Sequence, residues 1–149
     1  MRVSATLHAV CCALLLAAAP SCGREPSPTS ADALAGAYEL RSVNGRAVPV
    51  DALGGAVSGR LVLTRDGRVT RTIRYATSGV PGPIEQRSTG TYEVTGSEVS
   101  YRVVDERSPE GTLPLEAQGE LRARRLTFRY PAPGVGGGRV EEEYVRTGG

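Results

Sequence analysis

The sequence predicts an all-β domain, an eight-stranded antiparallel up-and-down barrel over residues 36–149. From residue 36 onward, apolar and polar residues alternate in short segments separated by turn residues, a pattern typical of antiparallel strands. The connections also alternate, being long after the first, third, fifth and seventh segments and tight after the others. Because alternate connections of a meander share an end, we expect one closed end and one end bearing four long loops.

Eight segments show this alternation. The predicted strands are residues 37–43, 60–64, 69–76, 89–94, 98–104, 117–122, 125–130 and 139–146. Alternation assigns the following residues to inward faces: Tyr38, Leu40, Leu61, Leu63, Val69, Arg71, Ile73, Tyr75, Tyr92, Val94, Val99, Tyr101, Val103, Gly119, Leu121, Leu126, Phe128, Tyr130, Val140, Glu142, Tyr144 and Arg146.

The connections follow from turn chemistry. A hairpin is expected at Asp66-Gly67, since this dipeptide accepts the positive φ of a tight turn. Other tight turns are expected at 95–97 and 123–124, and a short helical turn at 50–57. The predicted long loops are 44–59, 77–88, 105–116 and 131–138.

The first 21 residues have the form of a helical export signal. Arg2 precedes an apolar run from Ala9 to Ala19, 11 residues long. A bilayer-spanning helix needs about 20 apolar residues, so a removable signal is favoured. Residues 22–35, rich in Pro, Ser and Thr, are expected to form a flexible tether.

The segment ending at Cys22 resembles the lipobox of bacterial lipoproteins. It departs from that pattern in having Ala19 and Pro20 where the family usually has Leu and a small residue. The resemblance implies that Cys22 is acylated, for example with palmitate, and anchors the protein to a lipid bilayer. Gly23 is not the Asp that retains enteric lipoproteins at the inner membrane, which favours the outer membrane, facing the periplasm. Ordinary cleavage after Ser21, releasing a soluble periplasmic or secreted protein, is the alternative.

Composition argues against many functions. With 18 Lys and Arg against 16 Asp and Glu, charge gives no case for nucleic acid. The single His is His8, Lys is absent, and Cys11 and Cys12 lie in the signal. The mature chain therefore lacks Ser-His-Asp, Cys-His and Schiff-base chemistry and a zinc-binding imidazole. The triplet 141–143 supplies three acids, but strand neighbours point to opposite faces. We expect no enzyme, metal or cofactor.

Two short motifs resemble those of lipocalins and the wider calycin barrels. Gly36-x-Tyr38 is similar to the lipocalin Gly-x-Trp, and Arg146 is similar to the Arg that packs over that ring at the closed end. Cation–π stacking gives this pairing a physical reason. The chain lacks the Thr-Asp-Tyr turn and the helix after the last strand. The resemblance implies a lipocalin-like barrel with ligand entry at the long-loop end.

Five inward residues are candidates for a ligand site near that end. Tyr75, Tyr101 and Tyr130 could line a small amphipathic pocket, with Arg71 and Glu142 as polar anchors. In the competing interpretation the tyrosines fill the core and the two charges satisfy each other. The sequence thus favours an envelope lipoprotein that binds a small apolar or amphipathic molecule. The alternative is a structural lipoprotein that contacts an envelope protein through its long loops.

Overall fold

The computed structural model describes residues 30–50, 55–107, 113–132 and 137–148. The secondary structure is almost entirely β. Its elements are α1 (Ala31–Leu34), β1 (Gly36–Val43), β2 (Arg46–Ala47), β3 (Ala56–Leu63), β4 (Arg68–Tyr75), β5 (Ile84–Thr95), β6 (Glu98–Asp105), β7 (Leu115–Arg122), β8 (Arg125–Pro131) and β9 (Arg139–Thr147).

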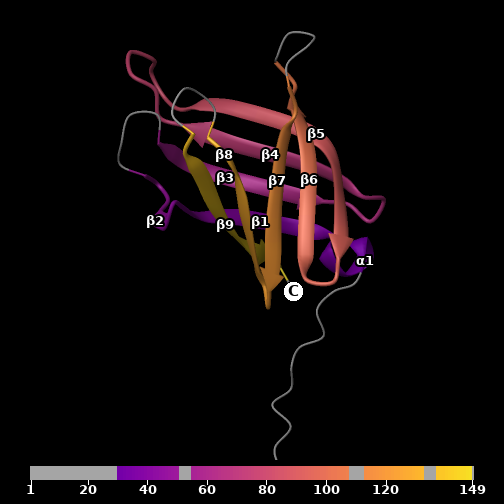
Figure 1. The fold of residues 1–149 in the computed structure, drawn as a ribbon. Helices are drawn as coiled ribbons and strands as arrows, with labels where there is room; N and C mark the ends of the chain where they lie inside the picture. Colours follow the sequence, from indigo (N-terminus) through magenta and orange to yellow (C-terminus); the bar gives the residue numbers. More distant parts are fainter. Residues whose placement is uncertain (1–29, 51–54, 108–112, 133–136, 149) are drawn as a thin grey trace, which may run out of the picture.

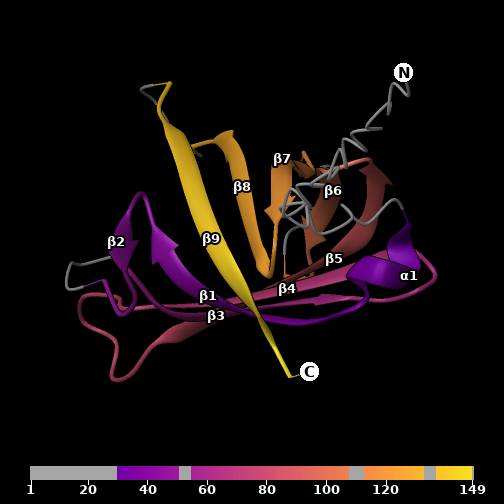
Figure 2. The ribbon, with the colours of Figure 1, turned by 90° about the horizontal axis from the view of Figure 1, so that it is seen from below.

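The sheet closes on itself. From β3 to β9 each strand pairs antiparallel with the next, β3 also pairs with β1, and β1 pairs with β9. Strands β1 and β3 to β9 therefore form an eight-stranded up-and-down barrel (Figures 1 and 2), which confirms the predicted fold class. All eight predicted strands are present, most of them one or more residues longer than predicted. The short β2 pairs with β1 alone.

The interior follows the predicted alternation. Most residues assigned to inward faces are buried, including Arg71 and Glu142. Val94, Tyr75, Gly119, Val140 and Arg146 are half-buried. Full exclusion of apolar side chains such as Leu61, Ile73 and Phe128 from water supplies the main stabilising term of the fold.

The connection after β1 was predicted incorrectly. Asn44 and Gly45 both have positive φ, 51° and 73°, and form a two-residue turn that leads from β1 into β2. This is the geometry that Asn-Gly favours in a hairpin. The strand predicted to begin at residue 60 begins at Ala56. Of the helical turn predicted at 50–57, residues 51–54 lie outside the described residues, while 56 and 57 belong to β3.

The expectation of a tether up to Ala35 is wrong for its last residues. Ala31–Leu34 form α1, and Leu34 is fully buried. The Tyr38 hydroxyl donates to the Leu34 carbonyl at 2.8 Å, so the helix is held against the barrel. The folded domain therefore includes α1, because its apolar side chain belongs to the core. The expected signal peptide and Cys22 lie outside the described residues.

The helix lies at the end of the barrel that carries the tight turns (Figure 1). The Tyr92 hydroxyl lies 2.7 Å from the carbonyl oxygen of Thr64, in the β3–β4 turn, and 3.0 Å from that of Ala31. The helix and this turn thus cover the closed end. No helix within the described ranges has the length and apolar character needed to cross a bilayer.

The Gly36, Tyr38 and Arg146 set is brought together at the closed end. The Arg146 guanidinium carbon lies 5.9 Å from the centre of the Tyr38 ring. Gly36 has a φ of +156°, which other residues rarely adopt, and a Cβ there would lie 3.0 Å from Arg146 Nε, so a side chain at this position is disfavoured. The predicted closed-end packing is present, with α1 as an added component.

Candidate functional site

A pocket opens at the end opposite α1. It has a volume of about 1260 Å³, larger than a drug-sized molecule requires. It is lined by residues from the second halves of β1, β6 and β8, from the middle and end of β4, from the first halves of β3, β5, β7 and β9, and from β2. Antiparallel order brings these strand ends to one mouth, where the connection between β4 and β5 also lies (Figure 1).

Glu142, on β9, lies in the floor of this pocket and is 2 % exposed. Its Oε1 accepts hydrogen bonds from Arg71 Nη2 at 2.5 Å and from the Tyr130 hydroxyl at 2.7 Å. Its Oε2 accepts from Arg71 Nε at 3.2 Å and from the Tyr144 hydroxyl at 2.8 Å. Four donors occupy about four lone-pair sites, so the protein satisfies this carboxylate completely.

Arg71, on β4, is held from across the barrel by Glu142 and is 3 % exposed. Its Nη2 also donates to the Tyr130 hydroxyl at 3.1 Å. Burial is the largest single influence and opposes the charged form, but the Glu142 carboxylate together with Tyr144 and Tyr101 outweighs it, so the pKa of Arg71 is raised. The guanidinium is therefore a buried, permanent cation.

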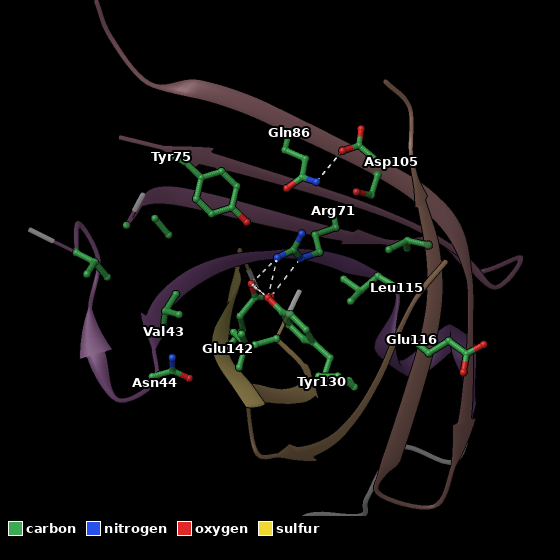
Figure 3. Close-up of a pocket in the computed structure, with 18 of the residues that line it drawn as sticks. Val43, Asn44, Arg71, Tyr75, Gln86, Asp105, Leu115, Glu116, Tyr130 and Glu142 are labelled. Carbon is green, nitrogen blue, oxygen red and sulfur yellow. Dashed lines mark hydrogen bonds and ion pairs between the residues drawn. The ribbon is translucent and has the colours of Figure 1, made fainter. Parts of the chain in front are cut away.

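One nitrogen of this guanidinium stays available to the pocket. Within the described residues, Arg71 Nη1 has no hydrogen-bond partner. Figure 3 shows it directed away from Glu142, towards the space between Tyr75 and Gln86. The floor thus presents two N–H groups that are ready to donate to a bound molecule.

Four of the five predicted site residues line the pocket: Arg71, Tyr75, Tyr130 and Glu142. Tyr101 does not. It lies in the core with its ring centre 4.6 Å from that of Phe128, and its hydroxyl has no partner among the described residues. Burial raises the pKa of Tyr101, and it also raises those of Tyr130 and Tyr144, where Glu142 adds to the effect. All three hydroxyls therefore stay protonated at neutral pH.

Sequence reasoning missed six polar residues of the pocket: Gln86, Ser88, Asp105, Asn44, Arg46 and Glu116. Gln86 Nε2 donates to Asp105 Oδ2 at 2.6 Å, linking β5 to β6 (Figure 3). The sequence predicts a loop over 77–88, which includes Gln86 and Ser88, whereas β5 begins at Ile84. Continuing the alternation backward from Tyr92 would have placed both on the inward face.

The walls above the floor are mainly apolar. They are formed by Val43, Val50, Ala56, Val103, Leu113, Pro114, Leu115, Pro131, Ala132 and Val140. Asn44, Arg46 and Glu116 complete the polar part of the lining. An apolar wall with a few convergent polar groups is the usual build of a small-molecule site.

The acids on either side of Glu142 face outward, as alternation predicts. Glu141 pairs with Arg129 at 2.7 Å and Glu143 with Arg125 at 3.0 Å. The described residues hold no group of three or more His, Cys, Asp or Glu side chains placed to bind a metal ion.

The pocket therefore offers hydrogen bonding and apolar contact to a bound molecule. Comparison of the chain with protein-family models, curated proteins and solved structures finds no match.

Proposed function

We propose that this protein is an envelope lipoprotein whose lipocalin-like barrel binds a small amphipathic molecule at its open end. The observation that supports the proposal is the combination of an apolar-walled pocket with an unused donor, Arg71 Nη1, on its floor. Among the described residues, the buried side-chain polar atom that lacks a partner is the Tyr101 hydroxyl, so Arg71 Nη1 reaches the pocket, where a bound acceptor would form charge-assisted hydrogen bonds with its two N–H groups.

The proposed anchor is an acylated Cys22, which would place the domain at a bilayer, with the periplasmic face of the outer membrane preferred. In this arrangement the chain enters the barrel at the closed end, through α1. The open end then faces away from the lipid and can exchange ligand with the periplasm. A soluble periplasmic or secreted form would have the same pocket without this orientation.

Native mass spectrometry of the mature chain carrying Cys22→Ser tests the binding function. We expect a small molecule from the envelope to copurify and to be released on unfolding. Leu115→Trp, which fills the pocket, should remove it, whereas Val104→Trp on the outer face of the same barrel should not. A Leu115→Trp protein that keeps the same adduct would contradict binding in this pocket.

A second candidate function is contact with an envelope protein through the long loops. It is favoured by large apolar side chains that stay exposed near the mouth: Val80, Ile84 and Leu113, which is 88 % exposed. Photocrosslinking from position 80 in cells tests it. A single partner that is lost when residues 77–83 are shortened would support this candidate, and labelling of many abundant proteins alike would argue against it.

A further inference from the structure

The charge balance of the pocket indicates what kind of polar group it accepts. This step rests on the proposed binding function and concerns the chemical class of the ligand. The floor holds two buried charges, Arg71 and Glu142, whose side chains are each 3 % exposed. Their net charge is zero, so the deep end of the pocket is polar without being an anion site.

An anionic head group would meet Arg71 only in competition with Glu142. A carboxylate on Nη1 would place a second negative charge on a guanidinium whose charge one carboxylate already compensates. Two anions close together in a poorly solvated site repel each other strongly. The described lining adds two further acids, Asp105 and Glu116, and one further base, Arg46, so its balance is one negative charge.

A cationic head group is also disfavoured at the floor. The atom that faces the ligand is a guanidinium nitrogen, which donates hydrogen bonds and accepts none. The oxygens of Glu142 already have four donors, so they offer a cation no free site. What remains unpaired within the described residues is a pair of donors on Nη1.

Two polar side chains lie beside Arg71 Nη1 and add further hydrogen-bonding groups to the floor of the pocket. In Figure 3 the Tyr75 hydroxyl and the Gln86 side chain flank the free nitrogen. Gln86 uses its Nε2 on Asp105, which leaves its carbonyl oxygen available to accept a hydrogen bond. A head group that accepts from Arg71 and donates to Gln86 therefore fits the deep end.

From these observations we infer that the ligand has an uncharged oxygen-bearing head group, such as a primary alcohol or amide, on an apolar body. Its oxygen accepts from Arg71 Nη1, and its apolar body lies along the walls that include Val103, Leu115 and Val140. Glu142 thus acts as a specificity residue, since it cancels the charge that would otherwise attract carboxylates.

Calorimetric titration of the mature Cys22→Ser protein with four probes that share an unbranched ten-carbon chain tests this inference. The probes are decanol, decanamide, decanoate and decyltrimethylammonium at pH 7.5, each below its aggregation concentration. We expect decanol and decanamide to bind at least about tenfold more tightly than either ion. Equal or tighter binding of decanoate would overturn the inference and leave the binding function intact. Binding of none of the four would instead overturn the proposed function.

Glu142→Gln provides a second test, because it removes the compensating charge and keeps the side-chain shape. In this variant Arg71 should take a carboxylate, so decanoate should gain at least about tenfold over decanol. Glu141→Gln removes the same charge one residue away, on the outer face, and should keep the original preference. An unchanged preference in folded Glu142→Gln would overturn the role of Glu142. If that variant does not fold, a rise in its folded fraction with decanoate but not with decanol is the expected result, and its absence would contradict the role.

Discussion

The guanidinium of Arg146 packs over the Tyr38 ring and donates to two backbone carbonyls of the N-terminal segment. Nη1 lies 3.2 Å from the Ala33 oxygen and Nη2 lies 2.5 Å from the Ala35 oxygen. One side chain of β9 therefore holds both the first strand and the end of α1. Arg146 thus links α1, β1 and β9 at the closed end of the barrel.

Arg146→Ala should destabilise the domain by about 2 kcal/mol, because it removes the cation–π contact and both hydrogen bonds. Urea unfolding followed by circular dichroism measures the change. The control is Arg124→Ala, in the turn at the same end, because among the described residues its guanidinium makes only a 3.5 Å approach to the Gly148 carbonyl. Equal stability of the two variants would contradict the role given to Arg146.

Gly90→Ala should be among the most damaging single substitutions. A Cβ at this position in β5 would lie 1.9 Å from the Arg102 carbonyl oxygen, which belongs to the paired strand β6. Backbone cannot move aside as a flexible side chain can, so we expect a loss of roughly 3 kcal/mol or failure to fold. Gly138→Ala, whose Cβ would meet only the Ala132 Cβ at 3.7 Å, is the matched control. Thermal unfolding of both variants measures the two losses of stability, and a loss in Gly90→Ala no larger than that in Gly138→Ala would contradict this prediction.

The sequence predicted the barrel well because alternation, a local property, sets which residues face inward. The sequence did not predict elements that are too short to show a repeating pattern. The two-residue strand β2 and the four-residue helix α1 contain too few residues to show a period. Leu34 is buried only because Tyr38 and Arg146, from β1 and β9, hold the helix in place.

In the candidate site, too, local alternation predicted which residues face inward, but not the contacts between residues that lie far apart in the sequence. Arg71 and Glu142 were both predicted to face inward, but they lie 71 residues apart and on strands that do not pair. That they would satisfy each other was one of two open interpretations, and the structure shows this pair. Which guanidinium nitrogen stays unpaired depends on the positions of Tyr130 and Tyr144 in three dimensions, and no sequence pattern encodes it. The prediction put Tyr101 in the pocket because alternation shows which face of a strand a residue occupies, but not how far along the barrel axis it lies.

Replacement of Cys22 by Ser should abolish incorporation of a fatty acid into the protein. The reason is that the proposed anchor uses the thiol of this residue, and the described domain has no other cysteine. Metabolic labelling with an alkyne-bearing palmitate analogue measures incorporation. Labelling that persists in Cys22→Ser would refute this position as the site of acylation, and a wild-type protein without label would favour the soluble alternative.

Two tyrosines that both lie in the core around Phe128 should respond in opposite ways to loss of their hydroxyl. Tyr101→Phe removes a buried hydroxyl that has no partner among the described residues, so it should stabilise the domain by about 1 kcal/mol. Tyr144→Phe removes one of the four donors to Glu142 and should cost about 2 kcal/mol. Urea unfolding of both variants checks the signs. A loss of stability in Tyr101→Phe would show that this hydroxyl has a partner in solution.

Stability should fall as the pH rises above about 10, the ordinary pKa of tyrosine. Burial raises the pKa of five of the six tyrosines: Tyr38, Tyr92, Tyr101, Tyr130 and Tyr144. The folded state therefore keeps protons that the unfolded chain loses, so the stabilisation is complete below pH 10 and declines above it.

For Tyr144, which is fully buried, this decline approaches about 1.4 kcal/mol per pH unit. The chain has no Lys, and Arg stays charged, so tyrosines dominate titration in this range. Urea unfolding of the Cys22→Ser protein between pH 8 and 11.5 measures the slope, and Tyr144→Phe should reduce it. A stability that is constant from pH 9 to 11.5 would mean that the buried hydroxyls ionise as readily in the folded protein as in the unfolded chain.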